Sequence, residues 1–156
     1  MTQGKDADVA KTYQLGPARR TVNALMTALL RLGVGDRSTY LLTTTGRKTG
    51  RPRTTPVILV EAGGERWLVS PYGLVGWVHN VRARPEVSLR RGRTTQVLHA
   101  EEVGSATAGP VLQRYVRQVR VTAPFFDAKA GDPVQDFAAE GARHPVFKLT
   151  EDAPAP

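Results

Sequence analysis

Cysteine is absent from this 156-residue sequence. Disulfide bonds, zinc–thiolate centres and thiol catalysis are therefore excluded, and the cysteine framework of a small secreted protein is missing. The sequence also has no apolar run as long as a membrane span, and its start, Met1–Asp6, lacks the apolar core of a signal peptide. These absences favour a cytoplasmic protein and leave peripheral contact with a membrane open.

The residue patterns of common self-sufficient active sites are missing as well. His79, His99 and His144 lie far apart and show no metal-binding spacing, so we expect no metal. The residues around Ser70 do not match the G-x-S-x-G pattern of a serine hydrolase. No carboxylate pair stands out either. If the protein is an enzyme, we expect a bound cofactor to supply the reactive atom.

Acidic and aromatic residues are both scarce. Lysine and arginine number 22 against 14 acidic residues, which gives a net charge of +8 and a pI near 10.4. This excess favours an anionic partner, such as a phosphorylated cofactor, a nucleic acid or an acidic lipid surface. The aromatic residues, 2 Trp, 4 Tyr and 4 Phe, do not interleave with basic residues as base-stacking surfaces require. We therefore expect no nucleic-acid partner.

The chain length fits one domain with its own core. Alternating patterns and turn residues predict six strands, at 40–45, 53–61, 66–70, 86–90, 94–103 and 144–149. Because short turns join most of these strands, we expect an α+β fold whose antiparallel sheet closes into a barrel.

Helical periodicity appears in three places. It predicts an amphipathic helix over 17–32, a short helix over 75–82 and a longer helix over 107–120, with a further helical turn around 134–139. Residues 121–133 have turn chemistry and two adjacent aromatics, so we expect a loop that packs something. We expect flexible tails over 1–16 and 151–156 around a single domain of residues 17–150.

A basic turn between the first two strands is the most distinctive stretch. It carries Arg47 and Lys48 between two glycines, and Arg51 and Arg53 follow. The cations, threonine hydroxyls and backbone N–H groups of such a turn can converge on an anion. A P-loop is excluded, because it requires glycine where Arg47 stands and must open a helix. The turn is either a phosphate-binding hairpin or a solvated basic loop, and spacing alone does not decide between them.

Four segments together resemble a known family. They are LTTTGRKTGRPR at 42–53 with Thr55-Pro56 behind it, VSPYG at 69–73, WVHNVRA at 77–83 and PEV at 85–87. The resemblance, over roughly residues 38–150, is to the deazaflavin-dependent nitroreductases of actinobacteria, the F-420H(2)-dependent quinone reductase family. It implies a six-stranded split β-barrel with flanking helices, like that of the FMN-binding pyridoxamine phosphate oxidases. It also implies an oxidoreductase that passes hydride from reduced coenzyme F-420 to quinones, nitroaromatics or other unsaturated acceptors.

The same resemblance implies a set of cofactor-binding residues. They are Thr45, Gly46, Arg47, Lys48, Thr49, Arg53, Thr55, Pro56, Ser70, Tyr72, Gly73, Trp77 and Asn80. By this analogy Arg47–Thr49 grip the phosphate and acidic tail of the cofactor, and Thr55-Pro56 lie against the deazaflavin ring. Trp77 and Asn80 supply an apolar wall and one amide beside the ring. For Trp77 taken alone, plain core packing is the favoured role.

The chain departs from the family pattern in two places. Better known members have Ser-Lys-Gly-Gly where this chain has Ser70-Pro71-Tyr72-Gly73, so one lysine is missing. The tyrosine-rich acceptor region of the family is represented here by Tyr115 and Phe125-Phe126. We take Tyr72 and Tyr115 as candidate catalytic proton donors, with His79 or solvent as alternatives.

Several alternatives stay open at this point. The same fold could hold FMN or haem, as related split barrels do, or it could carry lipids without catalysing a reaction. A barrel that binds nucleic acid is a further alternative, from a different class of function. We expect a small-molecule hydride acceptor as the partner, whose identity does not follow from the residues. The protein is either a monomer or a homodimer.

Overall fold

The computed structural model describes residues 38–151. The expected tail over 1–16, the expected helix over 17–32 and the last five residues of the chain lie outside the described residues. Glu151, which the sequence placed in the C-terminal tail, is the final residue of a strand.

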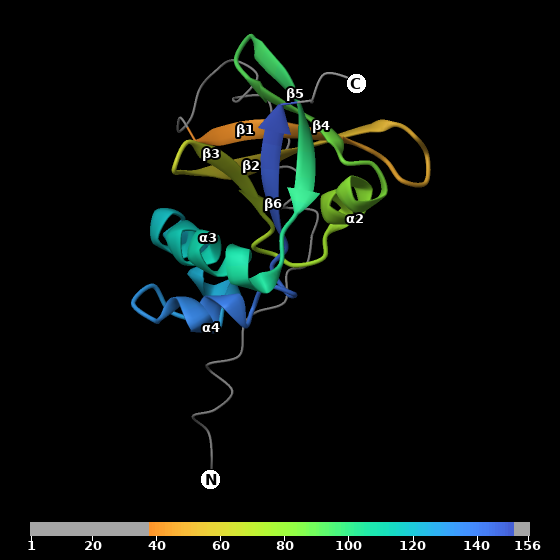
Figure 1. Cartoon of the computed structure of the whole chain (residues 1–156). Helices are drawn as coiled ribbons and strands as arrows, with labels where there is room; N and C mark the ends of the chain where they lie inside the picture. The colour runs from red at the N-terminus through yellow and green to blue at the C-terminus, as the bar shows by residue number, and fades with distance from the viewer. Residues whose placement is uncertain (1–37, 152–156) are drawn as a thin grey trace.

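Six strands form the body of the described part of the chain. They are β1 (Thr39–Thr45), β2 (Pro52–Ala62), β3 (Glu65–Val69), β4 (Glu86–Arg91), β5 (Thr94–Glu102) and β6 (Val146–Glu151). All neighbouring strands are antiparallel, and the order β1-β2-β3-β6-β5-β4 closes on itself (Figure 1). The expected six-stranded antiparallel barrel is confirmed. Closure gives every strand two partners, so the barrel has no unpaired edge.

The helices confirm most of the sequence periodicity. They are α2 (Gly76–Ala83), α3 (Ser105–Gln118), the 3₁₀ helix η2 (Arg120–Phe125) and α4 (Val134–Ala138). The prediction of a loop throughout 121–133 is wrong for its first part, which η2 occupies. The Thr122 hydroxyl donates to the carbonyl of Val119 at 2.7 Å and helps to close this short turn. None of the helices within residues 38–151 is long and apolar enough to cross a membrane.

Within residues 38–151, two apolar clusters make up the core. The inner one fills the barrel with leucines and other side chains from its strands, and Val78 and Val81 of α2 join it. The outer one lies between the barrel wall and the helices, where α3 packs its apolar stripe against β2, β3 and β6 (Figure 1). Alternate residues of β2 serve the two clusters, since Leu59 belongs to the inner and Val60 to the outer. Full burial of such a side chain contributes about 1.5–3 kcal/mol, so both clusters hold the barrel and α3 together.

Candidate functional site

The basic turn connects β1 to β2. Thr45 pairs with Pro52, and inside this pair the N–H of Gly46 donates to the carbonyl of Arg51 at 2.8 Å. The N–H of Gly50 donates to the carbonyl of Gly46, also at 2.8 Å. Gly50 has a φ of 69°, the left-handed conformation that glycine adopts at no steric cost. The expected turn between Gly46 and Gly50 is confirmed, and of these two glycines only Gly50 has a positive φ.

Asn80 attaches this turn to α2. Its Oδ1 accepts from the backbone N–H of Arg47 at 3.1 Å and from the Arg47 guanidinium at 3.5 Å. Its Nδ2 donates to the hydroxyl of Thr44 on β1 at 3.1 Å. Asn80 and Thr44 are only 6% and 2% exposed. The fold therefore brings Asn80 to the basic turn, where its amide holds the turn from the inside.

The backbone of the turn offers less to an anion than the sequence suggested. The N–H groups of Gly46, Arg47 and Gly50 donate within the protein, and that of Arg51 donates to the Thr49 hydroxyl at 3.2 Å. The prediction that backbone N–H groups of the turn converge on an anion is therefore wrong for these four groups.

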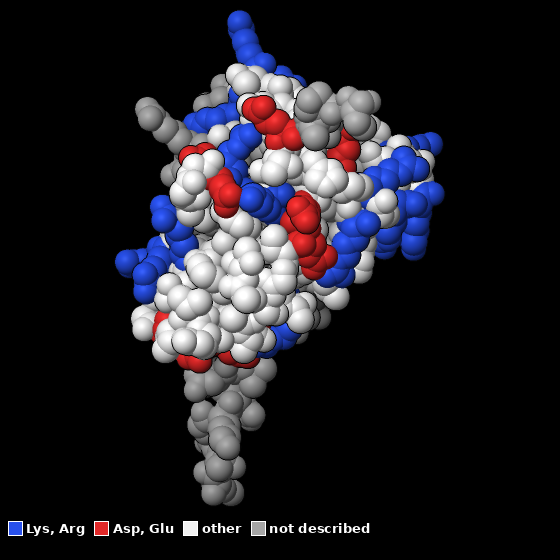
Figure 2. Space-filling view, in the orientation of Figure 1, with Lys and Arg blue, Asp and Glu red and all other residues white. Residues whose placement is uncertain are grey.

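The side chains of the turn remain available to an anion. Arg47, Lys48, Arg51 and Arg53 are all exposed, and Figure 2 shows basic side chains gathered at the edge of the molecule where this turn lies. Guanidinium and ammonium groups bind phosphate and carboxylate through charge-assisted hydrogen bonds. Their number on one short turn suits a ligand with several negative charges.

Thr55 and Pro56 follow on β2. Both are partly exposed, and they point to opposite faces of the strand because side chains alternate. Their predicted contact with a planar ring stays a prediction. The neighbouring Thr54 hydroxyl shares a hydrogen bond of 2.8 Å with that of Thr43 on β1.

The segment Ser70–Gly73 leads from β3 toward α2. The Ser70 hydroxyl donates to the carbonyl of Gly73, and the Ser70 N–H donates to the carbonyl of Pro145 at 2.9 Å. Gly73 has a φ of 85°, and a Cβ atom there would lie 3.3 Å from the carbonyl oxygen of Arg143. These contacts tie the segment to the chain that precedes β6.

Tyr72 projects from this segment onto an aromatic neighbour. Its ring meets that of Phe125 edge to face, with 4.8 Å between centroids and an interplanar angle of 82°. Such T-shaped pairs are favourable because the positive ring edge meets the negative ring face. Tyr72 is partly exposed, so part of its side chain can reach a ligand.

Tyr115 lies on α3 in the outer cluster and is 3% exposed. Burial raises the pKa of its phenol well above 10, and the nearby Tyr72 adds to the rise. The fold thus brings the two candidate proton donors near one another, from β3–α2 and from α3. Because Tyr72 is more exposed and Tyr115 holds its proton tightly, Tyr72 is the better placed of the two. Their catalytic roles stay predictions.

Trp77 and His79 are partly exposed residues of α2. The Trp77 ring lies 5.7 Å from that of Phe147 and packs at the border of the inner cluster. This position is compatible with both roles expected for Trp77, core packing and a wall beside a ligand.

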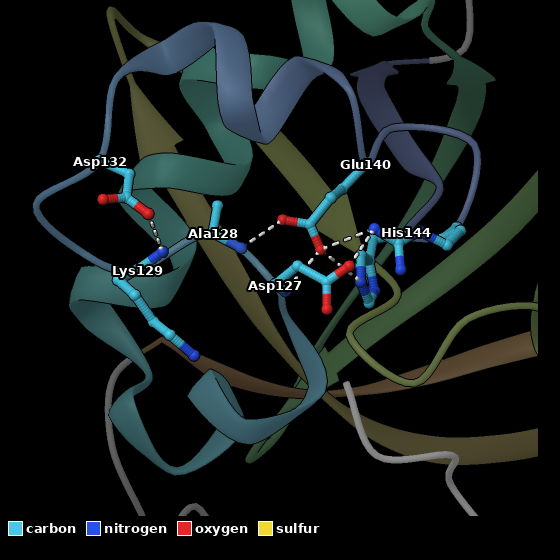
Figure 3. Close-up of polar contacts among 7 residues, drawn as sticks. Asp127, Ala128, Lys129, Asp132, Glu140 and His144 are labelled. Carbon is cyan, nitrogen blue, oxygen red and sulfur yellow. Dashed lines mark hydrogen bonds and ion pairs between the residues drawn. The ribbon is translucent and has the colours of Figure 1, made fainter. Parts of the chain in front are cut away.

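Sequence reasoning missed a buried polar cluster before β6 (Figure 3). Glu140 is 2% exposed, and its two carboxylate oxygens accept from the N–H groups of Asp127 and Ala128, both at 2.8 Å. His144 stacks on Phe126 with 4.0 Å between ring centroids, and its Nε2 lies 3.6 Å from Glu140. The spacing of four between Glu140 and His144 was visible in the sequence, but the loop that they hold was not.

Burial lowers the pKa of His144, and the charge of Arg143 lowers it further, whereas Glu140 opposes both. Between residues 38 and 151, no group of three or more histidine, aspartate or glutamate side chains is arranged to hold a metal ion.

Comparison with known proteins connects these features to a family. The family model for F-420H(2)-dependent quinone reductases matches residues 18–132. An F-420H(2)-dependent quinone reductase of Mycobacterium tuberculosis is 37% identical over 62 residues, which cover 37% of this chain and 42% of the relative. The match thus spans less than half the length of this relative.

Two solved structures have the same fold. An F-420-H2-dependent reductase aligns with a TM-score of 0.50 and 28% identity, over 75% of this chain and 97% of that one. A protein of Listeria innocua assigned as a pyridoxamine 5′-phosphate oxidase aligns with a TM-score of 0.53 and 12% identity, over 85% and 94% of the two chains. The second likeness concerns the fold alone, and it confirms the expected split barrel. With the family match extending over most of its length, the chain belongs to the F-420H(2)-dependent quinone reductase family.

Proposed function

We propose that this protein is an oxidoreductase that transfers hydride from reduced coenzyme F-420 to a small unsaturated acceptor. The observation that carries the proposal is the exposed cationic turn Arg47–Arg53, which Asn80 holds against α2. Membership of the family supports the same cofactor. When bound, the reduced deazaflavin supplies the hydride.

The residues of the site fit such a cofactor. Arg47, Lys48 and Arg53 would hold its phosphate and acidic tail, because exposed cations match a polyanion without a costly buried charge. Trp77 would border the ring from α2. The protein's remaining tasks are to hold donor and acceptor in reacting geometry and to keep water away.

The aromatic pair of Tyr72 and Phe125 is the place where we expect the acceptor to bind. A planar quinone or nitroaromatic would stack or pack against these rings, and the partly exposed Tyr72 phenol would supply a proton to the reduced product. A cytoplasmic location, peripheral membrane contact and the choice between monomer and homodimer stay predictions.

Charge reversal in the turn tests the cofactor site. In the double variant Arg47→Glu/Lys48→Glu we expect coenzyme F-420 to bind at least about tenfold more weakly, since each charge-assisted contact contributes about 1.5–3 kcal/mol. Exposed turn charges contribute little to stability, so the fold should persist. The measurement is titration of tryptophan fluorescence with coenzyme F-420 and, in parallel, with FMN.

A second hairpin provides the matched control. Arg90→Glu/Arg93→Glu changes the net charge equally on the β4–β5 hairpin and should leave affinity within about twofold, apart from long-range electrostatics screened by salt. Equal affinity of the Arg47→Glu/Lys48→Glu variant and the native protein would refute the assignment of the turn. Binding of FMN in place of F-420 would keep the fold and overturn the function.

A further inference from the structure

The aromatic pair of Tyr72 and Phe125 joins two parts of the chain. Its ring rests on Phe125, at the end of η2, and its backbone belongs to the Ser70–Gly73 segment. Neither part is a regular strand or α-helix. Contacts outside these two parts, among them those of α3 with η2, keep them in register for the ring pair to persist.

The residues from Glu140 to Pro145 contact the chain directly after η2 and the Ser70–Gly73 segment. On one side, Glu140 accepts the N–H groups of Asp127 and Ala128, two and three residues after Phe125. On the other side, the carbonyl of Pro145 accepts the N–H of Ser70 at 2.9 Å, and the carbonyl of Arg143 lies against Gly73. His144 stacks on Phe126 between these contacts, and Figure 3 shows His144 beside Glu140.

Glu140 is chemically the central member of this set. A buried carboxylate is tolerated only when hydrogen bonds and counter-charges replace its lost hydration. Here both oxygens accept backbone N–H groups, and the Arg143 guanidinium lies 3.3 Å from Oε1 while also pairing with Asp127 at 2.8 Å. A carboxylate bound this way orders residues 126–128, which begin the irregular link from η2 to α4.

We propose that Glu140 is a positioning residue for Tyr72: by fixing the backbone of 127–128, it fixes Phe125 and thereby the orientation of the Tyr72 ring at the acceptor side of the site. Its consequence for catalysis rests on the proposed function, but the positioning itself does not. Glu140 touches neither cofactor nor acceptor in this scheme.

Glu140→Gln is the variant that tests the proposal. The glutamine keeps the shape but replaces one acceptor oxygen by an NH₂ donor, which would face an N–H of Asp127 or Ala128. The readout is ¹⁹F NMR of protein labelled with 3-fluorotyrosine, whose four tyrosine signals include one assigned to Tyr72 by Tyr72→Phe. We expect the Tyr72 signal to lose its ring-current shift from Phe125 and to become more accessible to a soluble paramagnet.

Glu101→Gln, an exposed carboxylate on β5, is the matched control and should leave the Tyr72 signal unchanged. A folded Glu140→Gln protein with an unaltered Tyr72 signal would overturn the proposal. If that variant does not fold, amide exchange in the native protein decides. The amides of Asp127 and Ala128 should then exchange slowly although they lie outside helices and strands, and exchange at the rate of an open loop would equally overturn it.

Steady-state kinetics with F-420H(2) and a quinone extend the test to catalysis. Glu140→Gln should reduce kcat/KM for the acceptor while leaving cofactor affinity unchanged, and the combined Glu140→Gln/Tyr72→Phe variant should lose no more than Tyr72→Phe alone. Additive losses would show that Glu140 acts through another group. Because the NMR and exchange measurements need no cofactor, failure of the proposed reaction would not be mistaken for failure of the positioning role.

Discussion

At the scale of single residues, the side chain of Asn80 shows how tertiary contacts define a role. The resemblance suggested that Asn80 binds the cofactor, and the structure places both ends of its amide in contact with β1 and the basic turn. An effect of Asn80 on ligand binding can therefore arise through the conformation of Arg47. A substitution of Thr44 can distinguish this indirect effect from direct contact between Asn80 and the ligand. Thr44 itself is too buried to touch a ligand.

The substitution Thr44→Val keeps the shape of the side chain and removes the acceptor for Asn80 Nδ2. Leaving a buried donor unsatisfied costs about 1–3 kcal/mol, so we expect a loss of that size in the free energy of unfolding. We also expect weaker binding of F-420. Urea unfolding and fluorescence titration measure the two effects.

Thr43→Val serves as the comparison on the same strand. It breaks an exposed hydroxyl pair with Thr54 and should cost only a few tenths of a kcal/mol, on the order of other surface changes. If Thr44→Val lowered stability yet bound F-420 as tightly as the native protein, Asn80 would not act through the turn.

At the scale of elements, the β1–β2 hairpin combines a backbone requirement with a charge requirement. The cations could stand on many loops, but the chain reverses here with a φ of 69° at position 50, a conformation that glycine adopts without strain. Among the described residues, no atom outside Gly50 and its two chain neighbours lies within 4 Å of a Cβ built on Gly50, so conformation and not space limits this position. A substitution at Gly50 can therefore destabilise the hairpin through the backbone conformation, even though the added side chain meets no steric clash.

Gly50→Ala should destabilise the protein by about 1–2 kcal/mol, the usual cost of left-handed backbone for a residue with a Cβ. It should also weaken F-420 binding as the turn relaxes. Thermal unfolding monitored by circular dichroism measures the first effect. Gly131→Ala, which adds a methyl group in open space without a positive φ, should be neutral or slightly stabilising. Equal melting temperatures of the two variants would contradict the argument.

At the scale of the whole molecule, His144 connects pH to stability. Its folded pKa is lowered, mainly by burial, from an unfolded value of about 6.5. As pH falls through this value, the unfolded chain takes up a proton that the folded protein does not. The contribution of His144 to stability is thus fully present above the unfolded pKa and is lost as the solution becomes more acidic.

His144→Phe preserves an aromatic ring against Phe126 and removes the titrating group. We expect the native protein to lose up to about 1.4 kcal/mol per pH unit below pH 6.5 from this histidine, and the variant to show a shallower slope. Urea unfolding at pH 7.5, 6.5 and 5.5 measures both slopes. A native slope in His144→Phe would assign the acid sensitivity to other groups.

The barrel and its helices could be predicted because their signals are local. Alternation marks the strands, 3.6-residue spacing marks α2 and α3, and glycine marks the basic turn. The observed ends of several strands differ by a few residues from the predicted ends, because long-range pairing decides where a strand ends. Ser70, for example, falls outside β3, and the residue paired with it through the backbone is Pro145 rather than a member of the β6 ladder.

The sequence alone determined the fold class, the cationic turn and, through its motifs, the family of this protein. Only the tertiary structure decided that Asn80 binds the turn from within, that Tyr115 is buried while Tyr72 stays partly exposed, and that Glu140 holds residues 127–128. The physical reason is range: periodicity, turn conformation and charge are properties of neighbouring residues. Burial and hydrogen-bond partners depend on segments that meet only when the barrel closes and the helices pack on it.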